Sequence, residues 1–135
     1  MFELDPRLHN DTFFVCDLSL CRVLLMNDSQ FPWLILVPMR SRVSEIIDLS
    51  GDDQVTLLRE SALVSKAMQA AFSPLKLNVA ALGNVVRQLH VHHVARYEND
   101  VAWPKPVWGA QPTIAYPQTQ AQERIALIKQ HLVQV

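Results

Sequence analysis

Long apolar runs, a surplus of charge and abundant cysteine are all missing from this chain of 135 residues. No stretch stays apolar for long enough to serve as a secretion signal or to span a membrane, so we expect neither. The formal net charge is only -1, which gives no general attraction for a long nucleic acid or for a membrane surface. An anionic ligand must therefore be held by local geometry.

The chain has only two cysteines, Cys16 and Cys21. They lack the paired spacing of a zinc site and the cysteine density of a secreted disulfide scaffold. We therefore expect two free thiols in a reducing compartment and a cytoplasmic protein.

What the chain does have is an ordinary globular composition, with 50% hydrophobic and 19% charged residues. That balance and the length predict a single domain over residues 1–135 with a core of its own. We find no internal repeat and no low-complexity tract.

Five segments are rich in β-branched and aromatic residues and are bounded by turn-forming residues. We expect strands at residues 11–16, 20–26, 33–37, 75–82 and 88–96. The first three follow one another closely, which predicts an antiparallel meander, and Gly83-Asn84 predicts a turn between the last two.

Two segments have helical periodicity. In the first, Ser50 with Asp53 predicts an N-terminal cap, and Pro74 ends the helix. We expect one face of this helix to carry Leu58, Ser61, Ala62, Ser65, Met68 and Phe72, with Arg59, Glu60 and Lys66 facing elsewhere. A second helix is expected over about 118–133. The predicted fold class is α+β: a five-stranded, mainly antiparallel sheet with one long helix and a C-terminal helix.

Residues 97–117 combine four prolines with Trp103 and Trp108. This composition is too aromatic for a disordered linker, so we expect an ordered loop. Either indole could stack on a base, but we favour the interpretation that both anchor the loop to the body or to a second subunit.

The segment from Gln88 to Arg96 is the most informative one, because three of the five histidines lie there. Alternate residues of a strand share a face, so Gln88, His90 and His92 should line one side while Leu89, Val91 and His93 point to the core. Two imidazoles and an amide in a row predict a chemical site.

Three hypotheses compete for these histidines. They could be buried side chains that only bond the backbone, or they could bind zinc with Asp28 or another carboxylate as third ligand. We favour nucleophilic catalysis, in which His90 attacks phosphorus while its other nitrogen is oriented by a backbone carbonyl or a polar neighbour. His92, about 6.6 Å further along the strand, can donate a hydrogen bond or a proton to the phosphate.

The run Gln88-Leu89-His90-Val91-His92-His93-Val94 resembles the motif of the histidine triad (HIT) family of nucleotide hydrolases and transferases. Gln88 stands where the family has its first histidine, His90 matches its nucleophile, and His92 matches its third histidine. Trp33 stands about where many members have a further histidine. Five other phrases are similar to a bacterial branch described as diadenosine tetraphosphate hydrolase-like: Asn10-Asp11-Thr12, residues 32–38, Leu77-Asn78-Val79, residues 82–86 and residues 102–109.

The resemblance implies a purine nucleoside pocket with an acid or amide on the ribose hydroxyls. Asn27 or Asp28 lies about where that contact belongs, although turn chemistry explains both residues equally well. Asn84 and Arg96 could hold phosphate oxygens; a turn position and a solvated strand end are their plain alternatives. Gln88 can orient the site but cannot relay a proton.

We thus expect an enzyme that binds a nucleotide or dinucleoside polyphosphate and passes through a nucleotidyl-histidine at His90, assisted by His92 and Gln88, with no metal or other cofactor. The resemblance also implies a homodimer. The competing function is a nucleotide sensor or adaptor of the same fold with little turnover, and a zinc-binding protein is the third possibility.

Overall fold

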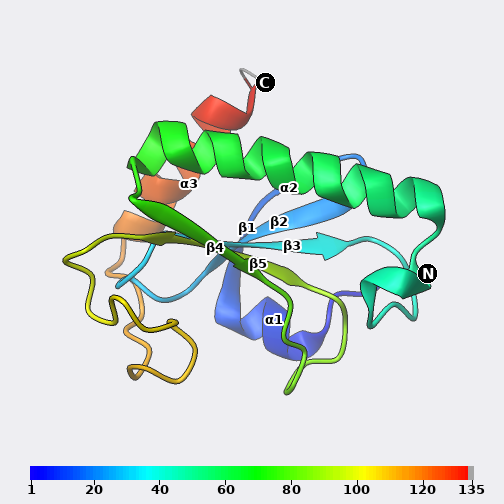
Figure 1. The fold of residues 1–135 in the computed structure, drawn as a ribbon, viewed down its shortest axis with the longest axis horizontal. Coiled ribbons are helices and arrows are strands. Elements are labelled where there is room, and N and C mark those ends of the chain that lie inside the picture. The colour runs from blue at the N-terminus through cyan, green and yellow to red at the C-terminus, as the bar shows by residue number, and fades with distance from the viewer. Residues whose placement is uncertain (134–135) are drawn as a thin grey trace.

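Five strands form one antiparallel sheet in the order β1-β2-β3-β5-β4 in the computed structural model, which describes residues 1–133 (Figure 1). The strands are β1 (Thr12–Asp17), β2 (Cys21–Met26), β3 (Trp33–Pro38), β4 (Lys76–Ala80) and β5 (Val91–Arg96). The helices are α1 (Pro6–Asp11), the 3-10 turn η1 (Ile46–Asp48), α2 (Gly51–Phe72) and α3 (Gln120–Val133). The α+β prediction and the meander β1-β2-β3 are confirmed.

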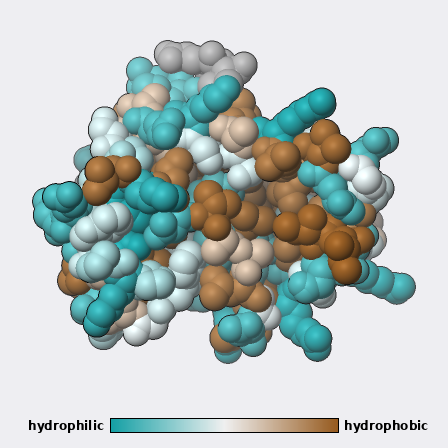
Figure 2. Space-filling model, viewed as in Figure 1, coloured by the Kyte–Doolittle hydropathy of each residue, from teal (hydrophilic) through white to brown (hydrophobic). Residues whose placement is uncertain are grey.

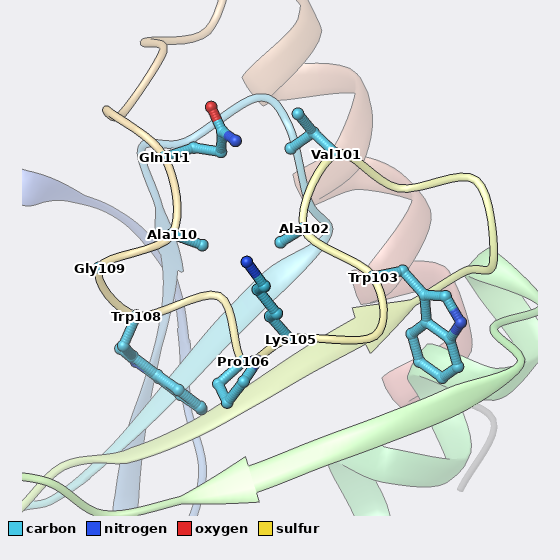
Figure 3. Close-up of a pocket in the computed structure, with 9 residues that line it drawn as sticks. All are labelled: Val101, Ala102, Trp103, Lys105, Pro106, Trp108, Gly109, Ala110 and Gln111. Atoms are coloured by element: carbon cyan, nitrogen blue, oxygen red, sulfur yellow. The ribbon is translucent and has the colours of Figure 1, made fainter.

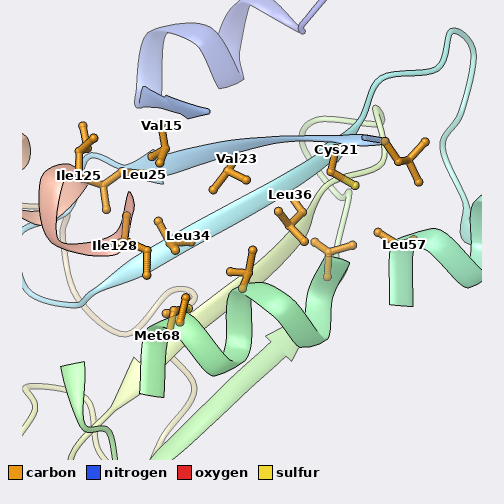
Figure 4. Close-up of a cluster of buried hydrophobic side chains, with 14 of the residues drawn as sticks. Val15, Cys21, Val23, Leu25, Leu34, Leu36, Leu57, Met68, Ile125 and Ile128 are labelled. Carbon is orange, nitrogen blue, oxygen red and sulfur yellow. The ribbon is translucent and has the colours of Figure 1, made fainter. Parts of the chain in front are cut away.

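The sheet has a helical layer on one face and mainly a loop on the other (Figure 1). The helices α2 and α3 cover the first face, where the larger core includes Val23, Leu36, Met68 and Ile128 (Figure 4). The second face packs under α1 and the loop that follows β5, around a smaller core. Because successive residues of a strand point to opposite faces, β5 contributes side chains to both cores.

The long helix α2 begins and ends as the sequence predicts. The Ser50 hydroxyl accepts a hydrogen bond from the Asp53 amide at 3.1 Å, and the chain leaves the helix through Ser73 in a left-handed conformation before Pro74.

The face of α2 that packs on the sheet differs from the predicted one and shares only Met68 with it among the buried residues. Leu58 is 72% exposed, whereas Glu60 is buried. The Glu60 carboxylate accepts hydrogen bonds from the amides of Leu20 and Cys21, where the chain enters β2, so a charged residue occupies the inner stripe. The buried positions are Leu57, Glu60, Val64, Ala67 and Met68.

Two short elements were not predicted, and two strands are shorter than expected. Helix α1 begins with Pro6 behind an Asp5 cap, whose carboxylate accepts from the Arg7 amide at 2.8 Å. Six residues are too few to show helical periodicity. Strand β5 begins at Val91, so Gln88 to His90 belong to the approach to the strand rather than to the ladder.

The loop of residues 97–117 is ordered against the second face. The Trp108 ring meets Trp33 edge-on at a centroid distance of 6.0 Å, and the Arg96 guanidinium lies 5.4 Å from the Trp103 ring centroid. Both tryptophans therefore contact the body of the fold, as the composition of the loop predicts. Cys16 and Cys21 are free thiols, and none of the helices in residues 1–133 is long and apolar enough to cross a membrane.

Candidate functional site

His90 and His92 open together onto a cavity of about 400 Å³ on the second face of the sheet. Its wall is mostly apolar and comes from four parts of the chain: α1, the central strands, the connection between β4 and β5, and the loop after β5. The lining residues are Arg7, Leu8, Asp11, Met26, Ile35, residues 82–86, His90, His92 and Trp108. Apolar walls with a few convergent polar groups are typical of small-molecule sites of this size.

The His90 ring is oriented by the main chain. Its Nδ1 lies 2.7 Å from the Gln88 carbonyl oxygen. A carbonyl oxygen only accepts, so Nδ1 carries the proton and donates it. In the neutral ring, Nε2 then has the free lone pair. This is the tautomer that a nucleophilic imidazole requires.

The His92 ring has the opposite tautomer. The Trp33 indole Nε1–H donates a hydrogen bond to His92 Nδ1 at 3.0 Å. Since an indole can only donate, Nδ1 must be an acceptor, and the single proton of the neutral ring is on Nε2. Burial, with smaller contributions from the neighbouring His90 and His93, lowers the pKa of His92 to about 3. His92 is therefore neutral near pH 7.

The two rings are direct neighbours. The centroids of His90 and His92 lie 4.9 Å apart with their planes at 70°, and the centroid of the Trp108 ring lies 5.3 Å from that of His92. An Nε2 lone pair on one ring and an Nε2–H on the other, facing one cavity, can attack phosphorus and bond a phosphate oxygen at the same time.

His93 faces the helical layer, as the strand alternation predicts. Its Nδ1 donates to the Val91 carbonyl oxygen at 3.1 Å, and its Nε2 accepts from the Ser61 hydroxyl of α2 at 2.7 Å. Burial lowers the pKa of His93 to about 4. This histidine ties β5 to α2 and takes no part in the cavity.

The prediction that the Gln88 side chain shares the face of the two rings is corrected. Its Oε1 accepts from the Asp5 amide and its Nε2 donates to the Glu3 carbonyl oxygen, each at 2.8 Å. The side chain therefore fastens the N-terminal segment. Gln88 reaches the site only through its backbone carbonyl, which holds His90.

The expected phosphate contact of Arg96 is also corrected. Its side chain is 1% exposed and is paired with Asp100, while two further N–H donors bond the Asn78 amide oxygen and the Lys105 carbonyl oxygen. Arg96 does not line the histidine cavity. With four of its five N–H donors engaged and its side chain away from the cavity, Arg96 is not placed to bind a phosphate there.

Among the other expected ligand contacts, Asn84 lies on the cavity wall with the two histidines. Asn27 accepts from the Tyr116 amide at 2.9 Å and lines an adjoining hollow. Asp28 is buried and accepts from the main-chain and side-chain nitrogens of Gln30, which is turn chemistry. The structure therefore brings Asn84 to the histidines and leaves Asn27 and Asp28 beside the loop.

Sequence reasoning missed Arg7 and Asp11, the two charged residues of the cavity wall. The available signal was Asp5-Pro6, a cap followed by proline at the start of a helix, which would have placed both residues on a helix before β1. Their approach to β5 is a long-range contact, which no local pattern encodes.

A second cavity, of about 510 Å³, lies within the loop of residues 101–111 (Figure 3). The Lys105 side chain points into it, and Trp108 lines both this cavity and the histidine cavity. Lys105 and the two imidazoles thus line neighbouring cavities that share Trp108. Within residues 1–133, no three histidine, cysteine, aspartate or glutamate side chains come together as a metal-binding set.

Comparison with known proteins gives a consistent result. The family model described as HIT domain matches residues 7–99. A histidine triad protein from Marinobacter aquaeolei has 48% identity and a TM-score of 0.96, over 99% of this chain and 98% of that one. A histidine triad protein from Bradyrhizobium japonicum has 44% identity and a TM-score of 0.95, over 97% and 98%.

More distant structures share the fold alone. A diadenosine triphosphate hydrolase from Plasmodium falciparum, solved with cyclomarin A, has 18% identity and a TM-score of 0.63 over 99% of this chain and 82% of that one. No curated protein sequence matches the chain significantly.

Proposed function

This chain belongs to the histidine triad family, whose members are generally nucleotide hydrolases or transferases, and on that premise we propose that it acts through a nucleotidyl-histidine formed at His90. The observation that carries the proposal is the pair of opposite tautomers at one cavity. The Gln88 carbonyl leaves the His90 Nε2 lone pair free, and the Trp33 indole leaves the His92 Nε2 with a proton.

In the proposed reaction, His90 Nε2 attacks the α-phosphorus of a nucleotide while the His92 Nε2–H bonds a phosphate oxygen. Water then hydrolyses the adduct, or another acceptor takes the nucleotidyl group. We assign Asn84 to a phosphate oxygen and Asp11 to the ribose hydroxyls, because both lie on the wall of the histidine cavity. The apolar part of the wall suits a base.

We propose dinucleoside polyphosphates as the first substrates to test, on the resemblance of the sequence phrases to the diadenosine tetraphosphate hydrolase-like branch. The reducing conditions implied by the free thiols of Cys16 and Cys21 support a cytoplasmic location.

The direct test is to trap the intermediate. The protein is mixed with a nucleotide labelled at the α-phosphate and quenched, and the label should remain on the protein in an acid-labile, base-stable linkage. His90→Ala should lose the label. His131→Ala, which changes a histidine on α3 far along the chain, should keep it. If wild-type protein binds the nucleotide but never carries the label, the chain is a nucleotide-binding module and the enzymatic proposal fails.

We further propose that two copies pair along β4, which forms one edge of the described sheet. One side of this strand has unpaired backbone groups, a template for a second strand. Beside it lies an apolar patch of Ile46, Val55, Leu58 and Val79, which are 45%, 49%, 72% and 48% exposed. Figure 2 shows apolar residues gathered in this region, over the first half of α2. Such a patch marks an interaction surface, and a two-fold pairing would bury it on both copies.

A further inference from the structure

We infer that Trp33 is a specificity-determining residue that restricts the reaction to leaving groups which depart as stable anions, such as phosphates, carboxylates and acidic phenols, and excludes amines. This inference rests on the proposed function and narrows its substrate class.

The hydrogen bond between Trp33 and His92 limits the proton chemistry of His92. A neutral imidazole readily gives up its Nε2 proton only if its Nδ1 can gain one, and Nδ1 is here occupied by the Trp33 indole N–H at 3.0 Å. An indole donates this hydrogen bond but does not release the proton near neutral pH. His92 can therefore hold a hydrogen bond to phosphate, but it cannot hand a proton to the leaving atom. The lowered pKa of His92, about 3, agrees with this geometry.

The chemical step is then balanced without proton transfer. The His90 Nε2 lone pair forms the N–P bond, the bond from phosphorus to the leaving oxygen breaks, and its electron pair stays on that oxygen, which departs as an anion. In the second step a water oxygen bonds to phosphorus, the N–P pair returns to Nε2, and the water proton is released to solvent. An amine leaving group must gain a proton before it departs, and His92 cannot supply one.

Few other groups near the two rings could donate a proton to the leaving group. From β5, His93 lies on the opposite face and bonds Ser61, and from the loop Trp108 presents an indole. On the cavity wall, α1 contributes Arg7, which keeps its proton in proteins, and Asp11. Lys105 lies across Trp108 in the neighbouring cavity. Asp11 and Lys105 are the groups that controls must address.

The kinetic test uses adenosine 5′-monophosphate joined to a series of phenols of increasing pKa and to an alkyl amine. The ratio kcat/KM reports the step in which the leaving group departs. For wild type we expect kcat/KM to fall steeply with the pKa of the phenol, and no measurable turnover of the amine. Trp33→His places an ionisable ring behind His92, so it should gain about 10²-fold or more on the least acidic phenols, the lower end of general acid catalysis. That gain should shrink toward none for the most acidic phenol.

Two controls separate the role of Trp33 from that of the other groups near the rings. Asp11→Asn and Lys105→Met should leave the slope of the series unchanged. A shallow slope in wild type, turnover of the amine, or a slope that depends on Asp11 or Lys105 would overturn the inference while the labelled His90 adduct still forms. If even the most acidic phenol yields no adduct, the proposed function itself has failed.

A second readout does not depend on a folded Trp33→His protein. In wild type labelled with ¹⁵N-histidine, the nitrogen shifts should show His92 as the Nε2–H tautomer down to about pH 5, below the ordinary histidine pKa. Trp33→Phe keeps an aromatic ring but removes the indole N–H, so the pKa of His92 should rise and its tautomers should mix. A wild-type His92 that titrates at its ordinary pKa, or that carries its proton on Nδ1, would overturn the inference.

Discussion

Replacing Asp100 by alanine should destabilise the fold strongly, because this residue is the centre of a buried ionic cluster. The side chains of Arg96 and Asp100 are 1% and 3% exposed and are joined at 2.8 Å. The same carboxylate accepts a second guanidinium bond at 3.1 Å and the amides of Tyr97, Ala102 and Trp103 at 2.7–3.1 Å. Asp100→Ala would leave a buried guanidinium without its counter-charge and the amides of Tyr97 and Ala102 without that acceptor, while the Trp103 amide would keep only its 3.3 Å bond to the main-chain carbonyl of residue 100.

The magnitude follows from that geometry. Breaking a buried ion pair by removing one partner costs about 3–5 kcal/mol, because the remaining charge stays desolvated. For a domain of this size that corresponds to a fall in Tm of roughly 10–20 °C. Burial alone would raise the pKa of Asp100, but the Arg96 bond and the backbone amides outweigh it and lower that pKa below its ordinary value. The stabilisation is therefore present above the unfolded-state pKa and is lost as the pH falls through the lowered folded-state pKa.

Urea unfolding at neutral pH measures the effect, with Asp17→Ala as the matched control. Asp17 pairs with Arg22 at the same 2.8 Å, but these side chains are 39% and 29% exposed, so the control should lose less than about 1 kcal/mol. Equal losses in the two variants would refute the reasoning. If Arg96→Met left the stability unchanged and raised KM for the nucleotide, Arg96 would be a phosphate-binding residue rather than a structural one.

Three further predictions concern the histidine strand and the exposed apolar patch. Gln88→Ala should lower the free energy of unfolding by about 1–3 kcal/mol, since it leaves two main-chain groups of the N-terminal segment without partners. The labelled nucleotidyl adduct should still form, because the carbonyl that orients His90 belongs to the backbone. Loss of the adduct in a folded variant would contradict this prediction. The folded-state pKa values of His92 and His93, about 3 and 4, lie below the ordinary histidine value, so the unfolded chain takes up protons first as the pH falls. The free energy of unfolding should therefore fall between about pH 6.5 and 4, by up to about 1.4 kcal/mol per pH unit for each ring. A flat profile in that range would refute the assignment of both rings as neutral. Leu58→Lys should convert a dimer to monomers in sedimentation, whereas Phe14→Lys on the opposite sheet edge should not, and an unchanged mass for Leu58→Lys would reject the β4 interface.

Local patterns were sufficient for most of the fold. Strand-forming runs separated by turn residues located all five strands, and Ser50 and Pro74 located both ends of α2. The inner face of α2 could not be read in the same way, because Glu60 is buried only through its bonds to the amides of Leu20 and Cys21, some 40 positions earlier. A hydrophobic stripe predicts apolar burial and cannot predict a carboxylate that is satisfied across the fold.

The candidate site shows the same division between local and distant information. Alternation along the predicted strand of residues 88–96 put His90 and His92 on one face and His93 on the other, and in the structure the first two line the cavity while His93 bonds α2. It did not predict that the Gln88 side chain would hydrogen-bond the N-terminal segment or that Arg96 would form an ion pair with Asp100. Both polar side chains are engaged by residues whose approach depends on how the loops fold, so spacing within the strand carries no information about them.

The partner behind each imidazole, rather than the spacing of the motif, therefore decides what that ring can do. The Gln88 carbonyl oxygen leaves His90 a free lone pair, and the Trp33 indole N–H leaves His92 a hydrogen-bond donor that cannot relay a proton. The Ser61 hydroxyl gives His93 a structural role. These partners lie outside the motif or on its main chain, so two chains with identical histidines can differ in proton chemistry through one distant residue. In this chain that residue is Trp33. An exchange there should alter which leaving groups are tolerated without moving either catalytic ring.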